Sequence, residues 1–443
     1  MKKLPLISLF ALSIWPFPLR GASGELYQFN DAMTLETLES IEVTSGAQNS
    51  DAAMEQPYVV IVSLDGFRYD YPTLHHATNL QAMMESGSYA RRLLPSFPSV
   101  TFPNHYTIAT GLYPSHSGLV GNTMYSREKD AVYRIRDKEA VRDGSWYGGT
   151  PLWSLAETQG MLSASFFWVG SEAGEPLTPP AYYFRYDSSV PYALRVAQVE
   201  KWLELPEKER PHLIFLYYSL TDSAGHLYGP ESEATGKAVR YVDAVVGELR
   251  DYIGKSELPI NLIVLADHGM APVSNVCNVR DFVDLGENFF AGLGPVAMIY
   301  TKSPAEKERI YKALVNRSEF ATYTSETIPD YLNYRNKDRI GDIILISTPP
   351  TSLEYMGPEK APYSRELKGT HGFDPYAVKE MGAIFIAEGP NIESGLVLPP
   401  VENIHIYPFV ASILGLKVPD SIDGKAEKLA PLLKQTKDPE AGE

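Results

Sequence analysis

The stretch YVVIVSLD, residues 58–65, is an apolar run that ends at an aspartate, and the same arrangement occurs twice more. The second run is HLIFLYYSLTD, residues 212–222, and the third is NLIVLADH, residues 261–268. A near-continuous apolar run is typical of a strand buried on both faces of a parallel sheet. Because the carboxyl ends of such strands share one edge, where open α/β folds build their sites, we expect Asp65, Asp222 and Asp267 to converge there.

Strand and helix patterns alternate from about residue 57 onward. This alternation predicts an α/β fold with a doubly wound, mostly parallel sheet and helices on both faces. Between about 270 and 368 the pattern is less regular, and we interpret this stretch as an irregular α+β insertion. Strands are predicted at 58–64, 213–219, 262–266, 296–300, 342–347 and 383–387, and helices at 78–87, 152–158, 191–205, 231–252 and 304–315, with another helix beginning just after Thr101.

The first residues have the order of a secretory signal. Lys2 and Lys3 precede an apolar stretch that ends at Leu19, and small residues follow Arg20. This order predicts a signal peptide and an exported protein, periplasmic or secreted. A short membrane anchor is the alternative, but about 16 apolar residues interrupted by prolines are too few for a stable span. We expect a signal peptide at 1–23, a polar linker at 24–56, the main domain at 57–431 and a frayed tail at 432–443.

Charge and cysteine content restrict the partners and the compartment. The formal net charge is −16, and no long cluster of lysine or arginine interrupts it, which argues against extended nucleic-acid binding. Cys277 is the only cysteine, so no intrachain disulfide can form. An exported protein without a disulfide fits a bacterial periplasm, and we interpret Cys277 as a small buried side chain without a catalytic role.

The three strand-ending aspartates need a positive partner, because carboxylates that share one site repel each other. Histidines stand close to them: His226 lies four residues after Asp222, His268 follows Asp267, and His371 lies in a glycine-flanked loop. A spacing of four puts Asp222 and His226 on one face of a helix. Carboxylates and imidazoles without a thiolate favour zinc, with manganese, cobalt and iron left open.

The segment TFPNH, residues 101–105, supplies a candidate nucleophile. A hydroxyl at a helix N-terminus beside a cation can attack phosphorus, while exposed amides help to hold the anion. Taken alone, however, the segment favours the simpler interpretation that Thr101 is a helix N-cap, and Asp65 or Asp222 alone could also be one. Asn122 is a candidate amide donor to a phosphoryl oxygen, although Gly-Asn alone is only a turn signal.

These motifs together resemble those of the nucleotide pyrophosphatase/phosphodiesterase family of the alkaline phosphatase superfamily, in a bacterial-type form. The resemblance runs from about residue 57 to 431. It rests on DGFR from Asp65, TFPNH from Thr101, GLYP from Gly111, Gly121-Asn122, Asp222-x3-His226, DHGM from Asp267, His371-Gly, ENIHIY from Glu402 and IDG from Ile422.

The resemblance implies an alkaline-phosphatase-like core with two zinc ions per chain. It implies that a threonine nucleophile forms a covalent phosphothreonine intermediate, which water then releases. By that match one zinc takes Asp222, His226 and His371, the other takes Asp65, Asp267, His268 and the nucleophile Thr101, Asn122 stabilises the oxyanion, and Phe102 and Tyr186 bind the substrate by stacking on the base.

The family's activity implies hydrolysis of nucleoside triphosphates, dinucleotides or related phosphodiesters to nucleoside 5'-monophosphates, with a small-molecule substrate as the expected partner and the oligomeric state left open. The alternatives are a choline-phospholipid or lysophospholipid phosphodiesterase, or a phosphomonoesterase, with the same two-metal site. A non-catalytic envelope protein with a structural metal site is a third class. One departure concerns specificity, since the family's usual Trp-Pro-Gly stands here as Trp168-Val169-Gly170.

Overall fold

The computed structural model describes residues 29–292, 294–357 and 367–434. Within these residues the largest sheet has nine strands in the order β1-β8-β7-β9-β2-β10-β19-β3-β20. The five neighbours from β8 to β10 are parallel to one another, whereas β1 and β19 are antiparallel to theirs. The strands are β1 (Val43–Thr44), β8 (Tyr182–Phe184), β7 (Ser163–Phe166), β9 (Leu213–Tyr218), β2 (Tyr58–Leu64), β10 (Ile260–Leu265), β19 (Phe385–Glu388), β3 (Ser88–Ala90) and β20 (Val397–Leu398).

The apolar runs account for the centre of this sheet. All residues of β2, β9 and β10 are buried, as expected for strands covered on both faces. One group of helices consists of α4 (Thr78–Ser86) and α9 (Tyr192–Leu203), which both pack on α11 (Glu233–Lys255). A second group consists of α5 (Thr101–Thr110), α8 (Leu152–Thr158) and α13 (Ile406–Ile413). The predicted doubly wound, mostly parallel α/β fold is confirmed.

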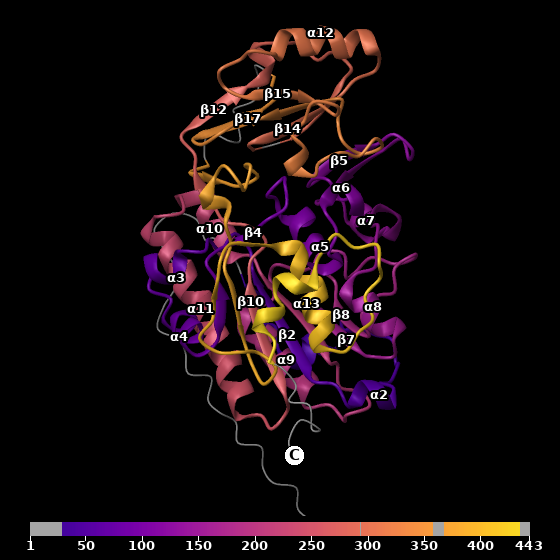
Figure 1. Cartoon of the computed structure of the whole chain (residues 1–443), viewed down its shortest axis with the longest axis vertical. Coiled ribbons are helices and arrows are strands. Elements are labelled where there is room, and N and C mark those ends of the chain that lie inside the picture. Colours follow the sequence, from indigo (N-terminus) through magenta and orange to yellow (C-terminus); the bar gives the residue numbers. More distant parts are fainter. Residues whose placement is uncertain (1–28, 293, 358–366, 435–443) are drawn as a thin grey trace, which may run out of the picture.

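The predicted insertion forms a small α+β lobe, drawn in orange at one end of the molecule in Figure 1. Its sheet has the order β13-β14-β16-β15, and β12 pairs with β17 beside it. One face of the sheet packs on α12 with a core that includes buried Cys277, while Met298 and Ile344 on the other face join the main core. The elements are β12 (Asn275–Asn278), β13 (Phe289–Ala291), β14 (Val296–Tyr300), α12 (Pro304–Leu314), β15 (Ala321–Thr324), β16 (Ile343–Ile346) and β17 (Thr351–Glu354).

The expected polar linker at 24–56 is wrong for its described part, residues 29–56. This part contains α1 (Leu35–Glu39), edge strand β1 and α2 (Asp51–Met54). Leu38 is fully buried, and Glu42 Oε1 accepts a hydrogen bond of 2.6 Å from Trp202 Nε1. The segment is ordered because it completes the sheet edge beside β8, where Thr44 is paired with Tyr182.

The predicted termini need one further correction. Leu432, which we expected in a frayed tail, is fully buried, and Leu433 forms a β-bridge with Ile392. The predicted signal peptide at 1–23 and the rest of the predicted tail, 435–443, lie outside the described residues. Of the helices that the structure describes, none is long and apolar enough to cross a bilayer.

Candidate functional site

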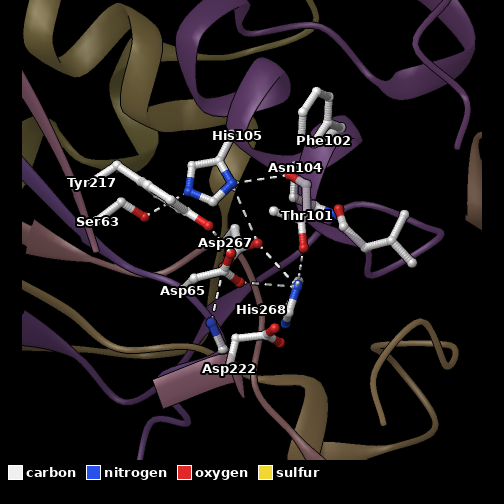
Figure 2. Close-up of polar contacts among 12 residues, drawn as sticks. Ser63, Asp65, Thr101, Phe102, Asn104, His105, Tyr217, Asp222, Asp267 and His268 are labelled. Carbon is white, nitrogen blue, oxygen red and sulfur yellow. Dashed lines mark hydrogen bonds and ion pairs between the residues drawn. The ribbon is translucent and has the colours of Figure 1, made fainter. Parts of the chain in front are cut away.

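The three aspartates lie together at the carboxyl edge of the sheet (Figure 2). Asp65 directly follows β2, and Asp267 lies two residues after β10. Asp222 is not at a strand end: β9 ends at Tyr218, and Asp222 lies in the first turn of α10 (Leu220–Tyr228). Gly66 has a φ of +68°, and a Cβ there would lie 2.9 Å from the Asp222 Cα, so only glycine allows this approach.

One group of ligand atoms is formed by Asp222, His226 and His371. Asp222 Oδ1 lies 3.3 Å from His226 Nε2 and 3.5 Å from His371 Nε2. The other ring nitrogen of each histidine donates to a backbone carbonyl: His226 Nδ1 to Gly369 and His371 Nδ1 to Ser99, both at 2.9 Å. Because these bonds fix the tautomer, both Nε2 lone pairs face the carboxylate oxygen, an arrangement that suits a cation between them.

A second group is formed by Asp65, Asp267 and His268. His268 Nε2 lies 3.0 Å from Asp267 Oδ2 and 3.6 Å from Asp65 Oδ1. His268 Nδ1 donates to the Gly269 carbonyl at 2.9 Å, which again leaves Nε2 as the ligating atom. The two groups adjoin, because the rings of His268 and His371 stack with centroids 3.6 Å apart.

The lack of hydrogen bonds from described residues to three buried carboxylate oxygens also supports a metal ion at these donor atoms. Asp65 Oδ1, Asp222 Oδ1 and Asp267 Oδ2 are buried and accept no hydrogen bond from the residues that the structure describes. Leaving a buried polar atom without a partner costs about 1–3 kcal/mol, and more for a charged one. A cation in each group would satisfy these oxygens, and carboxylate with imidazole is a donor set that zinc accepts.

The pKa values reflect the same crowding. Burial, followed by the charges of Asp267 and Asp222, raises the pKa of Asp65 well above its usual range. Burial would also raise the pKa of Asp267, but His268 and His105 outweigh it and hold that pKa well below its usual range. Burial, with His268 and His226 as neighbours, lowers the pKa of His371, which keeps its imidazole neutral and able to ligate.

Thr101 is the first residue of α5, and the N-cap is Val100, with φ −124° and ψ 155°. The simpler interpretation of Thr101 as a helix N-cap is therefore wrong. Its hydroxyl Oγ1 instead lies 3.2 Å from His268 Nε2, beside the second group (Figure 2). The hydroxyl of the nucleophile candidate Thr101 therefore lies next to the ring nitrogen with which His268 would bind a metal ion.

Asn122 lies just before β5 (Thr123–Ser126), next to the start of α5. Its Oδ1 accepts a hydrogen bond of 3.1 Å from the Phe102 backbone N–H. Because the carbonyl end of this amide is used there, Nδ2 is the end that can donate to a bound anion. The Phe102 amide, one of those we expected to hold the anion, is already bonded within the protein.

The two aromatic residues that we expect to stack on the substrate base, Phe102 and Tyr186, differ in their exposure to solvent. The Phe102 ring is partly buried and contacts Tyr133 at a centroid distance of 6.5 Å. Tyr186 is 44% exposed and contacts Phe167 at 5.2 Å and Tyr217 at 6.3 Å. Tyr217 Oη in turn donates to Asp65 Oδ2 at 2.5 Å. Tyr217 therefore contacts both Tyr186 and a residue that we expect to bind a metal ion.

Some residues of the site were not assigned from the sequence. His105 lies within the TFPNH segment, and its Nδ1 is 3.3 Å from Asp267 Oδ2. Its spacing of four from Thr101 is a signal that could have placed both on one helix face. Tyr217 and Thr221, which donate to the side chain and backbone carbonyl of Asp65, each at 2.5 Å, give no comparable signal because they contact it only through the fold.

Comparison with known proteins identifies relatives along most of the chain. Residues 59–374 match the family model described as type I phosphodiesterase / nucleotide pyrophosphatase. Venom phosphodiesterase CdcPDE of Crotalus durissus collilineatus is 35% identical over 409 residues, which cover 88% of this chain and 48% of that protein. Ectonucleotide pyrophosphatase/phosphodiesterase family member 1 of Homo sapiens is 34% identical over 86% of this chain and 42% of its own length. The chain thus spans about half the length of these curated relatives.

Two other relatives match over most of their own length. An uncharacterized pyrophosphatase/phosphodiesterase of Schizosaccharomyces pombe is 32% identical over 84% of this chain and 80% of that protein. The structure of murine ectonucleotide pyrophosphatase/phosphodiesterase 5 superposes with a TM-score of 0.80 at 28% identity, covering 85% of this chain and 100% of that one. An inactive threonine-to-alanine variant of the same murine protein has been solved in complex with AMP, also with a TM-score of 0.80.

Proposed function

Because the chain belongs to the type I phosphodiesterase / nucleotide pyrophosphatase family, we propose that it hydrolyses nucleoside triphosphates, dinucleotides or related phosphodiesters to nucleoside 5'-monophosphates. The observation that carries this proposal is the 3.2 Å separation of Thr101 Oγ1 from His268 Nε2, beside three carboxylates that need a cation. A hydroxyl in such surroundings has the chemistry of an activated nucleophile.

Two zinc ions complete the site in this proposal. One is held by Asp222, His226 and His371, and the other by Asp65, Asp267 and His268 together with Thr101. Bound zinc supplies positive charge that lowers the pKa of the threonine hydroxyl and offsets charge on the phosphoryl oxygens. This assignment is supported by the clustering of Asp65, Asp267 and His268, by the clustering of Asp222 with His371 and His268, by the 3.3 Å contact of His226 with Asp222, and by the oxygens left unpartnered among the described residues.

The chain's own residues carry the remaining steps. Thr101 Oγ1 attacks the phosphorus, forming an O–P bond as the bond to the leaving oxygen breaks, and the product is a phosphothreonine. Asn122 Nδ2 donates to a non-bridging oxygen, since Asn122 Oδ1 is held by Phe102 N–H. Water then attacks the same phosphorus, which releases the nucleoside 5'-monophosphate and restores Thr101.

Tyr186 stacks on the nucleotide base in this account, with Phe102 on the other side. We expect Tyr186→Ala to raise the KM for ATP about tenfold, since stacking of one base contributes about 1–3 kcal/mol. Hydrolysis of a phosphodiester without a base, such as bis(nitrophenyl) phosphate, should be unchanged. Tyr331→Ala is the control, because Tyr331 is similarly exposed, at 53% against 44%. An unchanged KM for ATP in Tyr186→Ala would refute the stacking role.

A turnover panel tests the substrate class directly. ATP, a dinucleotide, a choline lysophospholipid and a phosphate monoester are offered to the same purified protein at equal concentration. We expect the two nucleotides to be hydrolysed at least about tenfold faster than the others, a preference of roughly 1.4 kcal/mol in the transition state. Faster turnover of the lysophospholipid or of the monoester would replace the nucleotide proposal with that alternative, and no turnover would favour a non-catalytic role.

The protein is also exported in this proposal, to the periplasm or beyond the cell. The order of charged and apolar residues at 2–19 supports export. Similarity to phosphodiesterases of snake venom, a secreted fluid, is consistent with it.

A further inference from the structure

His105 is a fully buried imidazole between the nucleophile candidate and a metal-ligand candidate (Figure 2). It lies on α5, four residues after Thr101. Its Nε2 lies 2.8 Å from Ser63 Oγ on β2. Its Nδ1 lies 3.0 Å from the Thr101 backbone oxygen and 3.3 Å from Asp267 Oδ2.

The partners of this imidazole fix where its proton lies. A backbone carbonyl and a carboxylate only accept, so Nδ1 carries the hydrogen; it donates to Thr101 O, and Asp267 Oδ2 lies 3.3 Å from the same nitrogen at an ion-pair distance. Nε2 then accepts from the Ser63 hydroxyl. The ring cannot turn, because Trp168 and Tyr217 contact it edge-on at centroid distances of 5.1 and 5.2 Å.

The Asp267 carboxylate is thereby contacted at both oxygens, by a hydrogen bond at Oδ1 and by the His105 imidazole at Oδ2. Oδ1 accepts a hydrogen bond of 3.2 Å from Gly66 N–H, and Oδ2 faces the His105 donor. Oδ2 also lies 3.0 Å from His268 Nε2, so the His105 ring borders the oxygen that faces this metal-ligand candidate. Loss of a side chain that contacts and orients a metal ligand typically costs about 10–100-fold in metal affinity.

We propose that His105 is a positioning residue: it orients the Asp267 carboxylate as a metal ligand and fixes the position of that carboxylate relative to Thr101. The inference rests on the proposed two-metal phosphodiesterase and adds a residue that contacts neither metal nor substrate. Other buried histidines do not share this arrangement: His212 is also fully buried, but its Nδ1 bonds the Pro57 carbonyl at 3.1 Å and its ring stacks on Tyr58.

The test compares two substitutions, each of which places a polar side-chain atom at one of the two ring-nitrogen positions of His105. The asparagine side-chain nitrogen overlays Nδ1, so His105→Asn keeps the donor to Asp267 and loses the contact with Ser63. His105→Gln reaches the Nε2 position instead and loses the donor to Asp267. Zinc affinity is measured on the purified full chain by competition with a chromophoric chelator, without substrate.

We expect the affinity for the zinc held by Asp65, Asp267 and His268 to fall about 10–100-fold in His105→Gln and in His105→Leu. In His105→Asn it should stay within about threefold of the unsubstituted chain. His212→Leu is the matched control and should leave both zinc affinities unchanged. Melting temperatures establish that the variants are folded, and if His105→Leu does not fold, the comparison of Asn with Gln decides.

Equal zinc affinities in His105→Asn and His105→Gln would overturn the positioning role, whether both match the unsubstituted chain or both fall. That result is distinct from failure of the proposed function. If the unsubstituted chain binds no zinc, the two-metal proposal itself is wrong. If it binds two zinc ions and the variants do not differ, only the inference about His105 is lost.

Discussion

Thr101→Ala is expected to abolish hydrolysis of a nitrophenyl-TMP reporter while the protein stays folded. Removing a nucleophile that acts with its activating groups costs on the order of 10⁴-fold or more in kcat. The hydroxyl of Thr101 caps no helix, because Val100 holds the N-cap position, so its loss should cost little stability. Thr101→Ser should retain part of the activity, since it keeps a hydroxyl at the same place.

The control for this prediction lies on the same helix. Thr107 is fully buried, and its hydroxyl has no hydrogen-bond partner among the described residues. Thr107→Val removes that hydroxyl at nearly constant volume and should leave kcat unchanged. Rates are measured with melting temperature and zinc content for each variant. Retention of more than about a tenth of the activity by Thr101→Ala would exclude Thr101 as the nucleophile.

Removing metal is expected to have an equally large effect. A strong chelator should reduce activity to the background rate, and zinc added back should restore it. The reason is the crowding of Asp65, Asp222 and Asp267, each of which has one buried oxygen that accepts no hydrogen bond from the described residues. Without a cation, burial and its carboxylate neighbours raise the pKa of Asp65 and favour its protonated form, which is a poor ligand.

The same experiment predicts a change in stability. A ligand that binds only the folded chain stabilises it by about 4 kcal/mol when present at 1,000 times its Kd, so the melting temperature should fall on chelation and recover with zinc. Magnesium should not substitute, because it prefers oxygen ligands in octahedral geometry over imidazole. Full activity in a preparation shown to be metal-free would refute the two-metal account.

The sequence predicted the centre of the fold better than its edges. β2 is observed at the predicted residues 58–64, because its apolar run is bounded by a proline, Pro57, and an aspartate, Asp65. At 383–387 the observed strand is β19 (Phe385–Glu388), since Ala383 forms isolated bridges with Arg68 and Leu93 instead of joining it. Hydrophobicity predicts which residues are buried, but it does not show whether a buried residue belongs to a β-strand or forms an isolated β-bridge.

The candidate site was predicted where its residues are close in sequence or end a strand. Asp222 was expected at the end of β9, but the apolar run continues through buried Leu220 and Thr221 into α10, so the sequence gives no sign of the break. Tyr217 could not be assigned, because its role depends on a contact with Asp65, far away in the sequence, and the spacing that places His105 on the helix face of Thr101 does not reveal its contact with Asp267. Such contacts exist only once the strands are in register.

The stereochemical course at phosphorus tests the central claim most directly. A nucleoside triphosphate analogue with a chiral α-phosphorothioate is hydrolysed in isotopically labelled water, and the configuration of the product is determined. Each in-line displacement inverts phosphorus, so attack by Thr101 followed by attack by water predicts overall retention. Overall inversion would mean that water attacks the substrate directly, and it would contradict a covalent intermediate on Thr101.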